Sequence, residues 1–229
     1  MRFLKQFFIK NQPQAAPHVS KAPPALCEQA ARGFEDVYHS HQPEQLPWFW
    51  RDLDPDFLST LQQLGLTQGS VVDLGGGSGT QAIALAKLGF TSTSTDFSAA
   101  ALEGGREFAR QANVQVNFLL DDVTNSRLTT KFDLVLDRGC YHIIAPARRA
   151  DYLRTVVRCL APEGWFLFKC FSSDEPARPG PFRFSESEIR DFFGTSLDIV
   201  ELRKTEFPGA REIFPKALFA LMRHRPAHA

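Results

Sequence analysis

Short apolar runs alternate with amphipathic segments along most of the chain. The runs predict strands at 70–74, 114–120, 132–137 and 164–171, and the segment FTSTSTD at 90–96 is strand-like. The amphipathic segments predict helices at 80–89, after the cap residue Ser98, and around 147–160. Near-continuous apolar strands joined by helices are typical of a parallel sheet covered on both faces. The stretches 196–207 and 216–225 have no helical pattern between them and predict an antiparallel pair at one edge.

The chain divides into three expected parts. Residues 1–24 predict an N-terminal arm and a linker, because prolines recur there among glutamine and alanine. Residues 25–65 predict a helical cap, and 66–229 the α/β core of one domain, so that 25–229 form the folded unit.

The second helix of the cap has clear end signals. Asp54 is its expected N-cap, Pro55 occupies the first helical position, and Gly65 ends it. Its apolar stripe is expected at Leu58, Leu61 and Leu64.

Composition narrows the possible partners. Lys and Arg total 26 against 26 Asp and Glu, and zero net charge argues against broad nucleic-acid binding. No apolar run approaches the ~20 residues needed to cross a bilayer, and Lys5 interrupts the apolar start early, so we expect a cytoplasmic chain with no membrane partner. The four cysteines form no CxxC pair, which predicts reduced thiols and no metal site. Oligomeric state is open.

The candidate chemistry centres on the turn between the strand at 70–74 and the following helix. An acid, Asp73, ends the strand, and glycines follow it at Gly75, Gly76, Gly77 and Gly79. A turn without Cβ atoms lets a ligand approach the backbone. A nicotinamide enzyme would have glycine where Thr80 stands, and the Asp73 carboxylate would repel a pyrophosphate. It would attract an ammonium or sulfonium group, which favours S-adenosylmethionine as the cofactor over a merely structural turn.

Further acids end the next two strands. Asp96 ends the second strand, where doubly wound folds use a carboxylate to bind ribose hydroxyls. Its alternative role is to partner the N-terminus of the next helix. Asp121 and Asp122 end the third strand, and one of them could accept a hydrogen bond from an adenine amino group; a solvated loop is the alternative.

Residues 66–171 resemble the class I S-adenosylmethionine-dependent methyltransferases. VVDLGGGSGT is similar to their first motif, TDFS to their ribose-binding motif, and FLLDDV to their adenine-contacting segment. The resemblance implies a Rossmann-like, mostly parallel seven-stranded sheet with an antiparallel last strand. It also implies that Phe97, Asp122 and Val123 belong to the cofactor site.

Shorter signatures resemble a small-molecule subgroup that includes thiopurine, thiol, heterocyclic-toxin and tellurite-resistance methyltransferases. These signatures are DRGCYH at 137–142, Pro47-Trp48, and PGPFRFS in the later loop. The expected acceptor is a small thiol, heteroaromatic or metalloid compound. The alternatives are a protein or RNA methyltransferase, or a non-catalytic module that binds S-adenosylmethionine.

Candidate reactive residues follow the fourth strand. Methyl transfer is an in-line displacement that depends mainly on alignment. His142 is the candidate general base, because its pKa lies near working pH, and a packed histidine is the alternative. Asp137 is a candidate for cofactor or catalytic contacts, and Arg138 and Tyr141 for substrate contacts, with structural roles as alternatives. Trp48 could cover the sulfonium by a cation–π contact or pack in the core.

Overall fold

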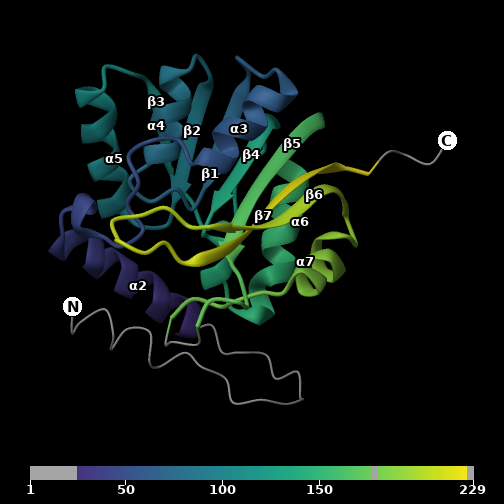
Figure 1. Ribbon diagram of the computed structural model, residues 1–229. Coiled ribbons are helices and arrows are strands. Elements are labelled where there is room, and N and C mark those ends of the chain that lie inside the picture. The colour runs from purple at the N-terminus through teal and green to yellow at the C-terminus, as the bar shows by residue number, and fades with distance from the viewer. Residues whose placement is uncertain (1–24, 177–179, 226–229) are drawn as a thin grey trace.

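A seven-stranded sheet runs through the centre of the protein (Figure 1). The computed structural model describes residues 25–176 and 180–225, so the arm and linker expected at 1–24 lie outside the described residues. The strand order is β3-β2-β1-β4-β5-β7-β6. The strands are β1 (Ser70–Leu74), β2 (Thr91–Asp96), β3 (Val116–Leu120), β4 (Phe132–Arg138), β5 (Leu160–Phe171), β6 (Leu197–Glu206) and β7 (Lys216–His224).

Strands β1 to β5 pair in parallel, whereas β7 pairs antiparallel with both β5 and β6. This confirms the predicted doubly wound, mostly parallel sheet. The antiparallel pair lies at one edge, as expected, and β7 inserts between β5 and β6.

Helices cover both faces of the sheet (Figure 1). They are α2 (Ala25–Ser40), α3 (Pro55–Leu64), α4 (Thr80–Lys87), α5 (Ala99–Gln111), α6 (Arg149–Cys159) and α7 (Glu186–Phe193). Side chains of α6 and α7 share one core cluster with Val72, and those of α3 and α4 share another with Val71. Because neighbouring strand residues point to opposite faces, β1 contributes to both clusters and is buried on both sides.

The structure corrects two local predictions. Phe57 of α3 is buried, whereas Leu58 is 37% exposed. The apolar stripe therefore begins one residue earlier than predicted. β5 begins at Leu160, directly after α6, and its pairing with β4 shifts register between Phe132 and Leu134. The Pro-Glu-Gly stretch at 162–164 is part of this strand and not a turn before it.

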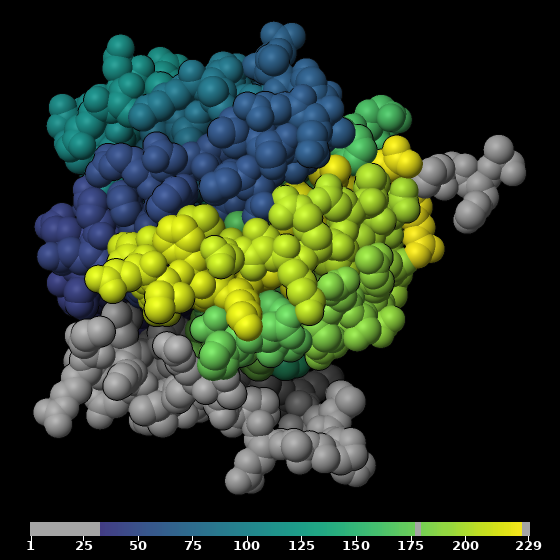
Figure 2. Space-filling model, viewed as in Figure 1, coloured from purple at the N-terminus to yellow at the C-terminus, as the bar shows by residue number. Residues whose placement is uncertain are grey.

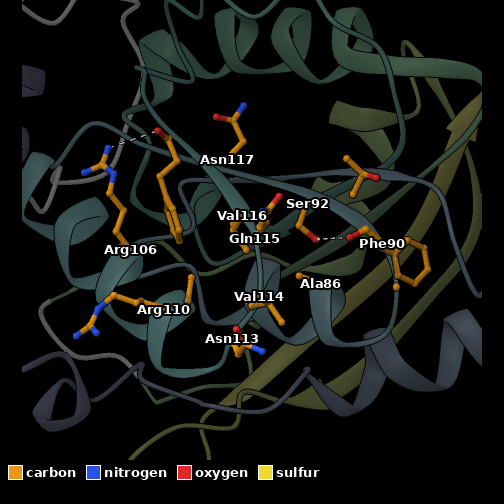
Figure 3. Close-up of a pocket in the computed structure, with 14 residues that line it drawn as sticks. Ala86, Phe90, Ser92, Arg106, Arg110, Asn113, Val114, Gln115, Val116 and Asn117 are labelled. Atoms are coloured by element: carbon orange, nitrogen blue, oxygen red, sulfur yellow. Dashed lines mark hydrogen bonds between the residues drawn. The ribbon is translucent and has the colours of Figure 1, made fainter.

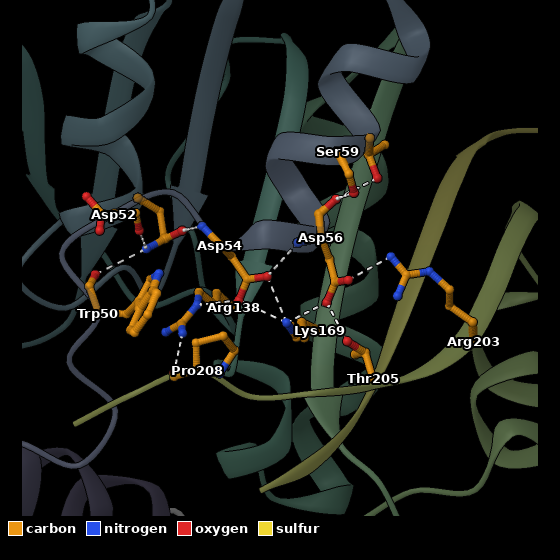
Figure 4. Close-up of polar contacts among 12 residues, drawn as sticks. Trp50, Asp52, Asp54, Asp56, Ser59, Arg138, Lys169, Arg203, Thr205 and Pro208 are labelled. Atoms are coloured by element: carbon orange, nitrogen blue, oxygen red, sulfur yellow. Dashed lines mark hydrogen bonds and ion pairs between the residues drawn. The ribbon is translucent and has the colours of Figure 1, made fainter. Parts of the chain in front are cut away.

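The segment before α3 is tied to the sheet by buried ion pairs (Figure 4). The Asp54 carboxylate lies 2.7 Å from the Lys169 ammonium of β5 and 2.8 Å from Arg138 Nε at the end of β4. Asp56 lies 2.6 Å from the same Lys169 and 2.7 Å from Arg203 of β6. These contacts bring together β4, β5, β6 and the start of α3.

The connection between β6 and β7 lies against residues 47–50, where yellow and purple atoms meet in Figure 2. The rings of Trp50 and Phe214 meet edge to face with centroids 5.8 Å apart. Gly209 packs on the carbonyl of Pro47, with no space for a side chain between them. The segment before α3 is therefore held from both sides.

The division into cap and core stays a prediction.

Replacing Lys169 with methionine is expected to destabilise the fold strongly. Lys169 is fully buried, and its removal leaves two buried carboxylates short of a counter-charge. Loss of one partner of a buried ion pair costs about 3–5 kcal/mol. The free energy of unfolding in urea measures the effect. Arg223→Met, which removes an exposed pair with Asp198, is the control and should cost at most about 1 kcal/mol. Equal effects of the two variants would contradict the structural role given to Lys169.

Candidate functional site

The glycine turn lies at the carboxyl end of β1. Gly75 and Gly77 have φ of 63° and 59°, in the left-handed region that favours glycine. The Gly76 N–H donates to the Thr95 carbonyl of β2 over 2.9 Å. A Cβ on Gly76 would collide with Asp73 Oδ2 and the Ser94 hydroxyl. The turn thus presents bare backbone directly above a buried carboxylate.

Asp73 is the unusual group of this site. Its side chain is 1% exposed, and within the described residues Oδ2 has no hydrogen-bond partner. Burial raises the pKa of the Asp73 carboxyl to about 7, and the nearby Asp137 carboxylate adds to the rise. A buried carboxylate without a partner is costly. Such a group favours a ligand that brings a positive charge or a donor.

Asp96 holds the other side of the turn. Its Oδ2 accepts from the Gly77 N–H over 2.9 Å, and Oδ1 accepts from the Ser98 N–H over 2.8 Å. Burial raises the pKa of Asp96 to about 6, although these hydrogen bonds oppose the rise. Each carboxylate oxygen has a second accepting position, so Asp96 can both orient the turn and bind hydroxyl groups. The next residue, Phe97, is part-buried and meets the ring of Phe34 edge to face at 6.1 Å.

The acids after β3 differ in exposure. Asp122 is exposed, and its Oδ1 accepts from the N–H and hydroxyl of Thr124. Asp121 is buried, and in the described part of the chain its Oδ2 has no partner. Val123 is buried in the core cluster of α6 and α7. The assignment of Asp122 and Val123 to an adenine site stays a prediction. Among the described residues, Asp121 adds an oxygen without a partner there, because only its Oδ1 accepts a hydrogen bond, from the Arg127 N–H.

Asp137 organises the loop after β4. Its Oδ1 accepts from the N–H groups of Gly139 and Cys140, and its Oδ2 from the N–H of Tyr141 and the hydroxyl of Tyr152, all within 2.9 Å. Burial raises the pKa of Asp137 to about 6 although these bonds oppose the rise. With four donors on two oxygens, Asp137 has no accepting position left for a ligand. This arrangement argues against the predicted catalytic and cofactor contacts and gives Asp137 a structural role.

Arg138 is also fully engaged. It donates to Asp54 and to the Pro208 carbonyl over 2.5 Å (Figure 4). It also donates to the Trp48 carbonyl over 3.2 Å. Its guanidinium lies 4.9 Å from the Phe207 ring centroid. An anionic substrate would have to displace these partners, so the structure argues against the predicted substrate contact. Arg138 instead joins three segments beside the site.

Tyr141 is buried among aromatic rings and not at a surface that a substrate could reach. Its centroid lies 5.0 to 5.5 Å from those of Tyr152, Phe168, Phe184 and Phe193. Its side chain is 2% exposed. The predicted substrate contact is not supported, because these partners come from β5, α6 and α7 and surround the ring.

His142 is buried and neutral. Its Nδ1 accepts from the Phe171 N–H over 3.2 Å, which places the ring proton on Nε2. Burial, together with the positive charges of Arg183 and Arg138, lowers the pKa of His142 to about 3. The ring stacks on Phe171 with centroids 4.4 Å apart and lies 5.7 Å from Phe207. A ring in this state can donate a hydrogen bond from Nε2 but is poorly suited to be the predicted general base.

The loop that carries His142 contacts the glycine turn. A Cβ on Gly75 would come within 2.5 Å of the Cys140 sulfur. Gly139 packs against the rings of His142 and Phe207. The turn after β1 and the loop after β4 therefore form one continuous site at the carboxyl edge of the sheet, where open α/β sheets bind ligands.

Tyr38 of α2 belongs to this site, although the sequence pattern gave no signal for it. A Cβ on Gly77 would collide with its hydroxyl. Trp48 is part-buried, and its Nε1–H donates to the Tyr38 oxygen over 3.1 Å. The helical cap thus places aromatic side chains over the turn, close to where Trp48 was expected to act.

A hollow of about 850 Å³ lies elsewhere on the protein, beside β3 and α5 (Figure 3). Its lining includes Arg106, Asn113 and Val116, and it reaches Ser92 near the start of β2. This is the opposite end of the strands from the glycine turn. We therefore assign it no part in the candidate site.

Over 25–176 and 180–225, no group of three or more His, Cys, Asp and Glu side chains is placed to hold a metal ion. No helix in those ranges is long and apolar enough to span a membrane.

Comparison with known proteins identifies the domain. Residues 71–164 match the family described as a methyltransferase domain. Burkholderia thailandensis 1,6-didemethyltoxoflavin-N1-methyltransferase, solved with 1,6-didemethyltoxoflavin and S-adenosylhomocysteine, superimposes with a TM-score of 0.72 at 21% identity, over 93% of this chain and 94% of that chain.

Two other solved structures share the fold. One, from work on the conversion of a disulfide bond into a thioacetal group during echinomycin biosynthesis, has a TM-score of 0.74 at 24% identity, over 85% of this chain and 92% of that one. TehB from Haemophilus influenzae has a TM-score of 0.63 at 20% identity, over 76% of this chain and 63% of that one.

Residues 71–164 therefore form a methyltransferase domain, within the fold that these structures share. This confirms the methyltransferase class predicted from the sequence and that the protein is an enzyme. The S-adenosylhomocysteine bound to the toxoflavin methyltransferase supports S-adenosylmethionine as the predicted methyl donor.

Proposed function

We propose that this enzyme methylates a small molecule, with the methyl donor bound over the glycine turn and the acceptor beside the loop after β4. The observation that carries the proposal is the buried Asp73 carboxylate, whose Oδ2 has no partner in the described chain, directly beneath Gly76. A turn with bare backbone and an unpartnered anion fits a ligand with an ammonium group and no phosphate.

The residues of the turn fit S-adenosylmethionine part by part. Asp73 would bind the ammonium group, and Asp96 the ribose hydroxyls through its remaining accepting positions. Asp122 and Val123, after β3, would contact the adenine. When bound, this cofactor supplies an electrophilic methyl group on a sulfonium. The chain has to bind it, exclude water and align the acceptor with it.

His142 is the proposed positioning residue for the acceptor. Its Nε2–H is a hydrogen-bond donor, and the rings of Phe171 and Phe207 lie beside it. A flat heteroaromatic compound with a hydrogen-bond acceptor atom matches this combination of donor and rings. The toxoflavin methyltransferase and TehB, which share the fold, support a heteroaromatic or metalloid acceptor over a macromolecule. The zero net charge also favours a small acceptor.

A transfer assay tests this function. The full chain is expected to bind S-adenosylhomocysteine in calorimetry. It should also transfer a labelled methyl group to at least one member of a panel of thiols, phenols, hydroxyquinolines, tellurite and selenite. No heat with S-adenosylhomocysteine would contradict cofactor binding. Binding without transfer to any panel member would contradict the small-molecule acceptor and favour a protein or RNA.

Two variants of His142 separate a donor role from a base role. In His142→Asn the amide oxygen can replace Nδ1 as acceptor for the Phe171 N–H, but the Nε2 donor is lost. In His142→Gln a donor remains near the Nε2 position. We expect kcat/KM to fall roughly three- to tenfold in the Asn variant, as for one lost neutral hydrogen bond, and less in the Gln variant.

The pH profile provides the control. His142, with a pKa of about 3, stays neutral above pH 4, so the wild-type rate should show no histidine inflection near its ordinary pKa of 6.5. A fall in rate below pH 6.5 that disappears in both variants would show that His142 acts as a base.

A further inference from the structure

The hydroxyl of Tyr38 lies over Gly77 with its proton free to donate. The oxygen accepts from Trp48 Nε1–H over 3.1 Å. Among the described residues, the Tyr38 hydroxyl accepts this hydrogen bond and donates none. The ring is fixed by Trp48, whose centroid lies 6.3 Å away at an interplanar angle of 69°. Trp48 thus orients the phenol, and the phenol presents its proton to the turn.

The surroundings keep Tyr38 protonated. Burial raises the pKa of the Tyr38 hydroxyl well above its ordinary value, and the negative charges of Asp96 and Asp73 add to the rise. Tyr38 is therefore a neutral donor placed close to two carboxylates, and not a competing anion.

The expected ligand has one group that these carboxylates cannot bind. S-adenosylmethionine carries a carboxylate on the same carbon as its ammonium group. Asp73 and Asp96 suit the ammonium and the ribose but repel an anion. Arg138, whose positive charge acts on Asp73, is engaged by Asp54 and two carbonyls. A neutral O–H donor over the turn meets the remaining requirement.

We propose that the Tyr38 hydroxyl, oriented by Trp48, binds the carboxylate of the methyl donor above Gly77. This inference rests on the proposed function of the turn. It makes Tyr38 a specificity residue for the cofactor: the contact distinguishes S-adenosylmethionine from its decarboxylated form. It also gives the helical cap, which lies outside the matched residues 71–164, a part in cofactor binding.

Binding of two ligands to the full chain tests the contact. Calorimetry compares S-adenosylmethionine with decarboxylated S-adenosylmethionine, which lacks only the carboxylate. Tyr38→Phe removes only the hydroxyl. We expect it to weaken binding of S-adenosylmethionine about tenfold or more, as for a hydrogen bond to a charged group, and to leave binding of the decarboxylated ligand unchanged.

Two more variants complete the experiment. Trp48→Phe removes the N–H that orients the phenol. It should selectively weaken the binding of S-adenosylmethionine, but by less than Tyr38→Phe does. This variant keeps the test valid if Tyr38→Phe does not fold. Thr195→Val removes a hydroxyl at the end of α7 and should leave both affinities unchanged.

Each result has one meaning. Equal losses for the two ligands, or no loss for either, would overturn the Tyr38 contact while leaving the proposed function in place. Failure of the wild-type chain to bind S-adenosylmethionine would overturn the proposed function and this contact with it.

Discussion

The site depends on the buried carboxylate of Asp73, whose Oδ2 has no hydrogen-bond partner among the described residues. It lies at the end of β1, a strand that is buried on both faces, and no cation of the described chain forms an ion pair with it. The folded chain holds a proton on Asp73 more tightly than the unfolded chain, because the pKa rises from 3.8 to about 7. Its contribution to stability is therefore present below pH 4 and lost as the pH rises through 7. A bound cation would offset this loss.

The neighbouring carboxylates differ from Asp73 because both oxygens of each already accept hydrogen bonds within the folded chain. Asp96 accepts two backbone N–H groups, and Asp137 accepts three and a tyrosine hydroxyl. These two fix the turn and the loop on either side of Asp73. Backbone donors can do this only where the chain bends, which is why both acids stand at the ends of strands. The backbone around Asp73 is therefore fixed, and the Asp73 Oδ2 atom stays able to bind a ligand.

Local patterns were sufficient to predict the fold and the turn. Strands β1, β4, β5 and β7 are largely apolar, and the spacing of Gly75, Gly77 and Gly79 after Asp73 is a feature of ten consecutive residues. The start of β5 was missed because Pro162 and Gly164 are typical of a turn, whereas Leu160 before them already pairs with Phe132 of β4.

The roles of single side chains depend on partners far away in the sequence. Arg138 was a candidate for substrate binding because it follows a strand, but its ion-pair partner Asp54 is 84 residues away. Tyr141 is enclosed by rings from three other elements. Tyr38 had no local signal, since only the packing of α2 over the sheet edge brings it to Gly77.

The protonation of Asp73 tests this account most directly. Carbon-13 NMR of the labelled carboxyl, titrated with and without S-adenosylhomocysteine, reports the pKa of this group, with Asp73→Asn to assign the signal. The account predicts a pKa near 7 in the free chain and a clear fall when the ligand's ammonium binds. An ordinary pKa near 3.8 in the free chain, or no change on binding, would contradict it.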